Sequence, residues 1–421
     1  MGKFSAQGHL FAGNLGKAAM MTLLCLTSGA PSQAQPQAQP IAVADAMLAR
    51  SVVTGTDFSR LQLVFERARR GEKIVVAVIG GSITAGANAT APEKRYANRI
   101  AAWWRETFPK AQIEFVNAGI GATGSDYAAL RAQRDLLSHG PDFVLVEFAV
   151  NDQNTRELAE RLEGLVRQTL RQTLRQTLHP ALLLLFMKGR GGGNAQEWQS
   201  KIGRHYGLPM VSYRDAVQPE IAAGRMSEED VMSDEVHPND RGHELAARLV
   251  TDYLQAALQN TPPNAAVGAI EPTPAPLLTD SFEEVHFYDG ANLHPTENRG
   301  WTFDAPSGSW TAKTPGSVLK CEVEGRLVNV VSFRIQGPMG RARVQVDDRP
   351  PVTLEGWFDA TWGGKISVDV AAQDLAPGKH QVRIEVLPDK AEGSAGHEFR
   401  LFGVAGVGVA GVGVAGVGVA P

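Results

Sequence analysis

Short apolar runs alternate with amphipathic segments through the middle of the chain, and this alternation constrains the fold more than any other feature. Five runs of strand length occur in order: KIVVAVIG, QIEFVNAG, DFVLVEFAV, ALLLLFMK and PMVSYRDAV. The segments between and after them have the helical spacing of apolar residues. Strand–helix alternation of this kind predicts a parallel sheet with right-handed crossovers and helices on both faces. We therefore expect an α/β domain over residues 56–259.

A different sequence texture follows the Pro-rich residues 260–277, which we interpret as an interdomain linker. Residues 278–407 contain short β-rich runs separated by Gly, Pro and Asp, among them SVLKCEVEG and HQVRIEVL. This pattern predicts an all-β, jelly-roll-like sandwich. Two repeats, RQTL within a predicted helix and VAGVG in the low-complexity tail at residues 408–421, indicate no chemistry.

The first 34 residues have the layout of a secretory signal peptide. Two lysines precede AAMMTLLCLT, an apolar run too short to span a bilayer, and the small residues of SQA at positions 32–34 suit cleavage. A linker rich in Gln, Pro and Ala is expected at residues 35–55. After cleavage Cys321 would be the only cysteine, which excludes an intramolecular disulfide. These features predict an exported protein, either periplasmic or secreted.

The charge balance excludes one broad class of partner. The chain has 41 Lys and Arg against 45 Asp and Glu, a formal net charge of −4. A protein that binds nucleic acid through its phosphates has a basic surface, which this composition does not indicate. The hydrophobic content of 43% is typical of a globular protein.

The first strand run, VVAVIGGSIT, ends abruptly in two glycines and Ser82. A serine between a strand and a helix can act as a nucleophile, because its own N–H then faces a developing oxyanion. Gly80 and Gly81 would allow the sharp turn and a close approach of substrate. The competing interpretation is an ordinary turn serine. A phosphate-binding loop is excluded, since neither Gly-Lys-Ser/Thr nor G-x-G-x-x-G is present.

Three other polar segments follow later strand runs. NAGIGATGS offers backbone N–H groups in a glycine-rich loop at the sheet edge where open α/β sheets bind ligands. FAVND places Asn151, whose amide could donate to an oxyanion, beside Asp152; either residue could instead cap the next helix. DEVH places Asp234 three residues before His237, so the carboxylate could orient the imidazole. Each segment also has an ordinary structural interpretation: a loop, a cap or a surface histidine.

A metal site is a weaker hypothesis for the last of these segments. Its candidate ligands are Asp234, His237, Asp240 and His243. The HExxH motif is absent, and a metal would leave the glycine loop and Asn151 without a role. We therefore expect neither a metal nor a cofactor. Asp240 is expected to cap the last helix, and His243 to be structural.

In this order, the motifs GGSIT, NAGIGATGS, FAVND and DEVH resemble those of the SGNH (GDSL-like) hydrolase superfamily over residues 70–258. The resemblance implies a flavodoxin-like three-layer α/β/α fold and the activity of an esterase, lipase, thioesterase or acyltransferase. It implies that Ser82 is the nucleophile, His237 the base and Asp234 the residue that orients His237. Two motif positions depart from the usual pattern, with Gly81 in place of Asp and Ala149 in place of Gly.

The resemblance also implies an oxyanion hole. Its donors would be the Ser82 N–H, the Asn151 side chain and one backbone N–H of the glycine loop. Counting from Asn117 favours Ala122 for that backbone donor, with Gly121 as the alternative.

The β-rich domain suggests the substrate. It contains four tryptophans that could stack on sugar rings or fill the sandwich core: Trp301, Trp310, Trp357 and Trp362. Exported members of the superfamily that carry a β-sandwich are often carbohydrate O-acetylesterases, so the resemblance implies an acylated poly- or oligosaccharide as substrate. The alternatives are a lipase, thioesterase or O-acyltransferase with the same chemistry, and a non-catalytic carbohydrate-binding protein.

Overall fold

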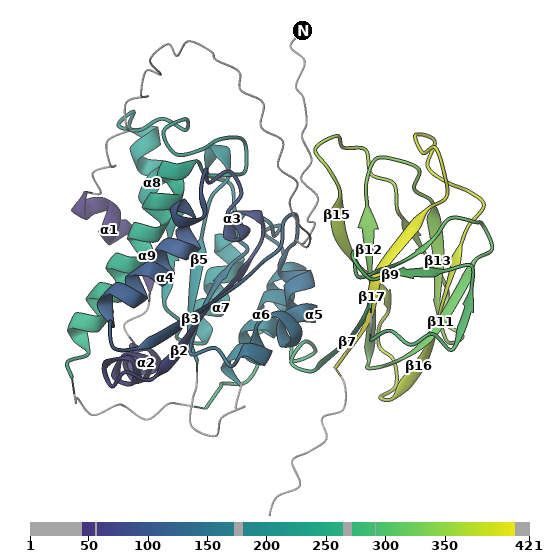
Figure 1. Ribbon diagram of the computed structural model, residues 1–421, viewed down its shortest axis with the longest axis horizontal. Helices are drawn as coiled ribbons and strands as arrows, with labels where there is room; N and C mark the ends of the chain where they lie inside the picture. The colour runs from purple at the N-terminus through teal and green to yellow at the C-terminus, as the bar shows by residue number, and fades with distance from the viewer. Residues whose placement is uncertain (1–43, 55–56, 172–179, 264–271, 291, 409–421) are drawn as a thin grey trace, which may run out of the picture. The chain divides into compact units, whose positions relative to one another are not determined.

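The computed structural model describes residues 44–54, 57–171, 180–263, 272–290 and 292–408 (Figure 1). The predicted signal peptide, residues 264–271 of the linker, the end of the RQTL repeat and residues 409–421 of the tail lie outside these residues. The first VAGVG unit, which starts at Val404, is described, and its residues up to Val407 belong to the end of the last strand. Among the described helices, none combines the length and the apolar character needed to cross a membrane.

The α/β domain is built on a six-stranded sheet with the strand order β1-β6-β5-β4-β2-β3. Neighbouring strands are parallel except at β1, which pairs antiparallel with β6. The strands are β1 (Val52–Thr54), β2 (Lys73–Gly80), β3 (Gln112–Gly119), β4 (Phe143–Glu147), β5 (Ala181–Phe186) and β6 (Met210–Ser212). Gly80 at the end of β2 is paired with both Gly119 and Glu147, so β2, β3 and β4 end level with one another.

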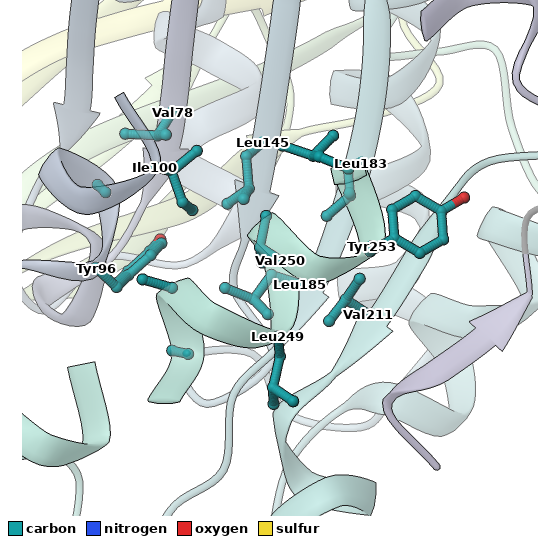
Figure 2. Close-up of a cluster of buried hydrophobic side chains, with 14 of the residues drawn as sticks. Val78, Tyr96, Ile100, Leu145, Leu183, Leu185, Val211, Leu249, Val250 and Tyr253 are labelled. Carbon is teal, nitrogen blue, oxygen red and sulfur yellow. The ribbon is translucent and has the colours of Figure 1, made fainter. Parts of the chain in front are cut away.

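Helices cover both faces of this sheet, which confirms the predicted three-layer domain. The described helices are α1 (Asp45–Ser51), α2 (Ser59–Arg69), α3 (Ser82–Ala85), α4 (Tyr96–Thr107), α5 (Ser125–Asp135), α6 (Arg156–Leu170), α7 (Gln196–His205), α8 (Tyr213–Ala222) and α9 (Asp240–Asn260). Alternate residues of β2 serve opposite faces: Val78 packs with α4 and α9, and Ile79 with α5 and α6. Figure 2 shows the first of these clusters, where Val78 lies near Ile100 and Leu145. Burial on both faces explains why the strand runs are almost continuously apolar.

The prediction of a linker at residues 35–55 is wrong for residues 45–54. Residues 45–54 form α1 and the edge strand β1. Met47 is buried in the domain core, and the Arg50 guanidinium donates to the carbonyl of Ala216 on α8 at 3.2 Å. The apolar residues of this segment find their partners only in the folded domain, so the Pro- and Gln-rich composition upstream of it does not describe its structure.

The fifth predicted strand is also shorter than expected. PMVSYRDAV contributes only the three residues of β6, and α8 begins at Tyr213. The Ser212 Oγ accepts a hydrogen bond from the Asp215 N–H at 2.9 Å, which caps the helix. This local cap ends the strand although the apolar pattern continues.

The β-rich region is the predicted sandwich of two antiparallel sheets. One sheet has the order β15-β12-β17-β10-β9, with β7 paired to β17, and the other has the order β14-β13-β16-β11-β8. The strands are β7 (Val285–Asp289), β8 (Glu297–Arg299), β9 (Thr302–Asp304), β10 (Ser309–Ala312), β11 (Val318–Glu324), β12 (Leu327–Arg334), β13 (Arg341–Val346), β14 (Val352–Glu355), β15 (Lys365–Ala372), β16 (Lys379–Val386) and β17 (Phe399–Val407). Side chains from both sheets, such as Leu319 and Val330, form its core, where Cys321 is also buried.

The sandwich and the α/β domain share a buried cluster. Phe282 and Val407 lie in the same cluster as Tyr127 of α5 and Leu162 of α6. A Cβ placed on Gly164 of α6 would lie 2.1 Å from the Phe282 Cβ, so glycine is required for this close approach. The two domains are therefore packed against each other through apolar contacts, as well as being joined by the 260–277 segment.

Candidate active site

Ser82 is the first residue of α3 and stands directly beyond the carboxyl end of β2. The two glycines before it are required by their neighbours. A Cβ on Gly80 would lie 2.0 Å from the Thr84 Oγ1, and a Cβ on Gly81 would lie 2.3 Å from the Asn151 Oδ1. A side chain at either position would displace Thr84 or Asn151. The glycines thus let the chain turn and keep Asn151 against the residue that precedes Ser82.

The structure brings Ser82, His237 and Asp234 into one chain of hydrogen bonds. The Ser82 Oγ lies 2.8 Å from the His237 Nε2, although 155 residues separate the two in sequence. The His237 Nδ1 lies 2.9 Å from one carboxylate oxygen of Asp234, Oδ2, and 3.1 Å from the other, Oδ1. This geometry lets the carboxylate hold the proton on Nδ1, which leaves Nε2 free to accept the Ser82 proton.

Backbone groups hold the Asp234 carboxylate in place. Its Oδ1 accepts hydrogen bonds from the N–H groups of Val236 at 2.8 Å and His237 at 2.7 Å. Partial burial opposes ionisation, but the hydrogen bonds from His237 and these backbone groups prevail and lower the pKa of Asp234 to about 2. The carboxylate is therefore ionised at neutral pH and can stabilise a positively charged imidazole.

Two groups suited to an oxyanion hole lie beside Ser82. The Asn151 amide packs against Gly81, and its Oδ1 is buried without a hydrogen-bond partner among the described residues. A Cβ placed on Gly121 would lie 3.8 Å from the Ser82 Cβ and would meet no other atom within 4 Å. Ala122 has a left-handed backbone, with φ at 56°, which turns the chain at this point. Gly121 therefore lies beside Ser82, which supports it, alongside Ala122, as a candidate for the backbone donor.

Comparison with known proteins shows the family of the chain. The family model for GDSL-like lipases and acylhydrolases matches residues 78–245. The crystal structure of a two-domain esterase (CEX) active on acetylated mannans, co-crystallised with mannopentaose, is 32% identical in sequence; the match covers 86% of this chain and 98% of that chain with a TM-score of 0.78. This chain belongs to the GDSL-like lipase/acylhydrolase family. It is an ester hydrolase with an α/β domain followed by an antiparallel β domain.

Two further comparisons add nothing to the assignment of the family. A structure of a catalytic mutant of an acetylxylan esterase from Geobacillus stearothermophilus is 17% identical to this GDSL-family hydrolase; the match covers 43% of this chain and 94% of that chain with a TM-score of 0.36. No curated protein matches the sequence.

Asp152 of the hydrolase has a structural task that sequence order did not indicate. Its Oδ1 accepts a hydrogen bond from the Ser125 N–H at 2.8 Å, and its Oδ2 accepts one from the Gln199 side chain at 2.9 Å. It therefore caps α5, while Thr155 caps α6, the helix that follows it in the chain. Burial raises the pKa of Asp152 to about 7. Only the folded sheet places the end of β4 beside the start of α5.

The two remaining candidates of the metal hypothesis have other partners. The Asp240 carboxylate accepts hydrogen bonds from Thr90 and Lys94, and the cap of α9 is Asn239, not Asp240 as expected. His243 is buried, as a structural residue would be, and its Nε2 lies 2.9 Å from the Ala87 carbonyl oxygen. Among the described residues, no group of three His, Cys, Asp or Glu is arranged to hold a metal ion.

The four tryptophans differ in exposure. Trp301 is 5% exposed and packs in the sandwich core, so it cannot contact a ligand and is removed from the candidate set. Trp310 and Trp357 are half-buried: the Trp310 Nε1 donates to the Gly290 carbonyl at 3.1 Å, and the Trp357 ring packs against Gly393. Trp362 is 63% exposed, and its ring lies edge-on to Phe358 with centroids 5.4 Å apart. The turn residues around the tryptophans do not distinguish the buried Trp301 from the exposed Trp362.

A buried hydrogen-bond network lies beneath Ser82; Glu147 at a strand end is expected from the sequence to be structural, but its contact with Thr84 has no local sequence signal. Glu147 at the end of β4 is completely buried, and its Oε2 accepts a hydrogen bond from the Thr84 hydroxyl at 3.3 Å. The Thr84 Oγ1 also lies 2.6 Å from the Tyr96 hydroxyl. Burial, more than any other cause, raises the pKa of Glu147 to about 8. The side chain is therefore mainly protonated at neutral pH and supports α3 without placing a charge under the site.

Replacement of Glu147 by glutamine should change the pH dependence of stability. Between the unfolded pKa of about 4.5 and the folded pKa of about 8, the native state holds a proton that the unfolded state has lost, so the wild type loses stability as pH rises. The loss should be on the order of a few kcal/mol by pH 8. A glutamine side chain cannot ionise, so urea denaturation from pH 5 to pH 8.5 should show a smaller decline for Glu147→Gln. Parallel curves for the two proteins would contradict a protonated Glu147.

Proposed function

We propose that this ester hydrolase is an exported serine acetylesterase that removes O-acetyl groups from a polysaccharide of the mannan type. The observation that carries the proposal is the continuous chain from the Ser82 Oγ through the His237 imidazole to the Asp234 carboxylate. A serine hydroxyl with a histidine and an ionised carboxylate behind it is the arrangement needed for nucleophilic acyl transfer.

The reaction would proceed through an acyl-enzyme. Ser82 attacks the acetyl carbonyl carbon as His237 takes its proton, and Asp234 stabilises the imidazolium that results. The N–H groups of Ser82 and Gly121 and the Asn151 amide donate to the oxyanion. His237 then protonates the sugar oxygen as its bond to the acetyl carbon breaks, so the sugar leaves with a free hydroxyl. A water molecule, deprotonated by His237, attacks the acetyl-serine, and acetate leaves as His237 returns that proton to the Ser82 Oγ, which restores the hydroxyl.

The substrate class rests on the comparison with the two-domain esterase, which is active on acetylated mannans and resembles this chain over nearly its whole length. The β-sandwich presents one exposed aromatic side chain, Trp362, which lies edge-on to the partly buried Phe358 and is of the kind that can stack on a sugar ring. Export rests on the signal-peptide pattern of residues 1–34, with cleavage after residue 34 as the expected result when the N-terminus of the mature protein is sequenced.

Acetate release from defined polymers tests this function. Purified protein is incubated with acetylated glucomannan, acetylated xylan and p-nitrophenyl esters of acetate and of longer acids, with Ser82→Ala as the blank. We expect fastest release from the mannan and from the acetate ester. Preference for longer acyl chains would favour a lipase or thioesterase. Acetyl transfer to an added sugar that outruns hydrolysis would show an acyltransferase, and binding without turnover would show a non-catalytic protein.

Trp362→Ala should separate polymer binding from chemistry. Loss of one exposed aromatic surface should raise KM on acetylated mannan about 3- to 10-fold, since a stacking contact contributes on the order of 1 kcal/mol. The kinetics on p-nitrophenyl acetate should not change, because that substrate is too small to need a sugar-binding surface. Equal kinetics of variant and wild type on the polymer would remove Trp362 from the substrate-binding set.

A further inference from the structure

A side chain outside the family motifs contacts the Asp234 carboxylate. Asn88 lies in the loop of residues 86–91, which follows α3 and leads through the 3-10 helix Pro92–Lys94 towards α4. Its Nδ2 donates a hydrogen bond to the Asp234 Oδ2 at 3.0 Å. That oxygen is also the nearer acceptor for the His237 Nδ1, at 2.9 Å. Asn88 and His237 therefore share one carboxylate oxygen.

We propose that Asn88 is a positioning residue that holds the Asp234 carboxylate at the rotation needed to orient His237, so that the hydrogen-bonded chain from Ser82 has four members. This inference rests on the proposed function, because it assigns Asn88 to the same catalytic chain. It adds a residue from the loop that follows the nucleophile's helix α3, six positions after Ser82.

The hydrogen bonds at Asp234 explain why a fourth group is needed. Backbone N–H groups of Val236 and His237 fix the Oδ1 from their own segment. The Oδ2 accepts hydrogen bonds from the His237 Nδ1, which belongs to the same segment, and from the Asn88 amide. Among the described residues, Asn88 is the only partner of this oxygen from another part of the chain. The Asp234 side chain is 46% exposed, so without Asn88 water would compete for this oxygen. Asn88 thus limits rotation of a carboxylate that burial alone does not hold.

The backbone at Asn88 supports a specific role for this residue type. Its φ is 62°, in the left-handed region that asparagine tolerates better than most residues. A residue with a β-branched or long side chain would meet strain there and could not present a short amide to Asp234. Asparagine therefore suits both the left-handed backbone at position 88 and the hydrogen bond to Asp234.

The loop that carries Asn88 is anchored to the histidine-bearing segment at other points. The Thr90 N–H and hydroxyl donate to the Asp240 carboxylate at 2.8 and 2.6 Å. The His243 Nε2 lies 2.9 Å from the Ala87 carbonyl oxygen, and burial lowers the pKa of His243, which keeps the ring neutral with one N–H to donate. Together these contacts tie the segment after Ser82 to the segment around His237. Asn88 is the contact in this set that reaches the catalytic carboxylate itself.

Asn88→Gly is the sharpest variant, because glycine accepts the left-handed backbone and removes only the amide. We expect kcat on p-nitrophenyl acetate to fall about fivefold, which corresponds to about 1 kcal/mol, with KM unchanged. Asp374→Gly is the matched control: Asp374 is another exposed residue with positive φ, at 54°, and lies in the sandwich. It should retain wild-type kinetics. A change of less than about 1.5-fold in both constants for Asn88→Gly would overturn the proposal.

A double-mutant cycle separates positioning through Asp234 from a general effect on the loop. In an Asp234→Ala background, Asn88→Gly should cause no further loss, because its partner is gone. If the fivefold loss recurs in that background, Asn88 acts through some other contact and the proposal is wrong.

Asn88→Asp provides a readout that needs no turnover. The added carboxylate lies against Asp234 and favours the protonated imidazole, so the pKa of His237 measured by NMR should rise. In the active protein, the acidic limb of the kcat/KM profile should move to higher pH in parallel. An unchanged His237 titration would overturn the proposal. If instead the titration shifts while wild type fails to hydrolyse acetyl esters, Asn88 is coupled to His237 and the proposed function is what fails.

Discussion

Replacing Ser82 by alanine should reduce kcat on acetyl esters by about 10³-fold or more while the protein stays folded. Among the described side chains, the Ser82 hydroxyl is hydrogen-bonded to the His237 Nε2 at 2.8 Å. Loss of this hydroxyl therefore removes the nucleophile without opening the core. The residual rate should still exceed that in water, since the Asn151 amide and the backbone N–H groups remain able to stabilise an oxyanion. Steady-state kinetics on p-nitrophenyl acetate measure the loss.

The control for this variant is its fold. Thermal unfolding followed by circular dichroism should give a midpoint within a few degrees of wild type, because Ser82 is only partly buried. A folded Ser82→Ala protein with near-wild-type turnover would contradict the acyl-enzyme mechanism and, with it, the assignment of His237 and Asp234.

Replacing Asn151 by alanine should lower kcat about 10²- to 10³-fold with a much smaller effect on KM. The reason is that an oxyanion-hole donor interacts most strongly with the charge that develops in the transition state. The Asn151 amide is close to the nucleophile, because a Cβ placed on Gly81, the residue before Ser82, would lie 2.8 Å from the Asn151 Nδ2, the group that would donate to the oxyanion. Kinetics that change mainly in KM would contradict the assignment.

Asn154→Ala is the matched control for Asn151. Asn154 lies three residues later in the same loop between β4 and α6, and its amide donates to Glu197 at 3.1 Å and accepts from the Trp198 N–H at 3.1 Å. The control therefore removes an asparagine from the same loop whose hydrogen bonds do not involve the Ser82 segment. Turnover should fall less than about threefold, whereas an effect equal to that of Asn151→Ala would point to a shared structural cause.

Much of the α/β domain was predictable because its signals are local. The buried runs that became β2, β4 and β5 are apolar on both faces, and that pattern alone requires helices on both sides. The position of Ser82 was predictable for a similar reason, since two glycines after a buried strand mark a sharp turn at the sheet edge. The spacing of Asp234 and His237 also lies within one turn of chain, so their hydrogen bond was expected and is present.

Contacts between distant segments could be expected only through resemblance to a family, and several could not be expected at all. The pairing of Ser82 with His237 is an example of the first kind. The Thr84–Glu147 network and the Asn88–Asp234 hydrogen bond are examples of the second, because each joins residues that no periodicity relates. Burial of Trp301 and exposure of Trp362 likewise depend on which strand faces the sandwich core.

The sequence by itself determined which residues can form strands and helices, where the chain must turn at Gly80 and Gly81, and which polar side chains stand at strand ends. Tertiary structure alone decided that Gly121 lies beside Ser82, that Asp152 caps α5, and that α1 joins the core. The physical reason is the distance along the sequence over which each interaction acts. Hydrophobic periodicity, capping and backbone conformation act over a few residues, whereas a hydrogen bond across 146 residues, such as that from Asn88 to Asp234, exists only after the sheet has aligned the strand ends.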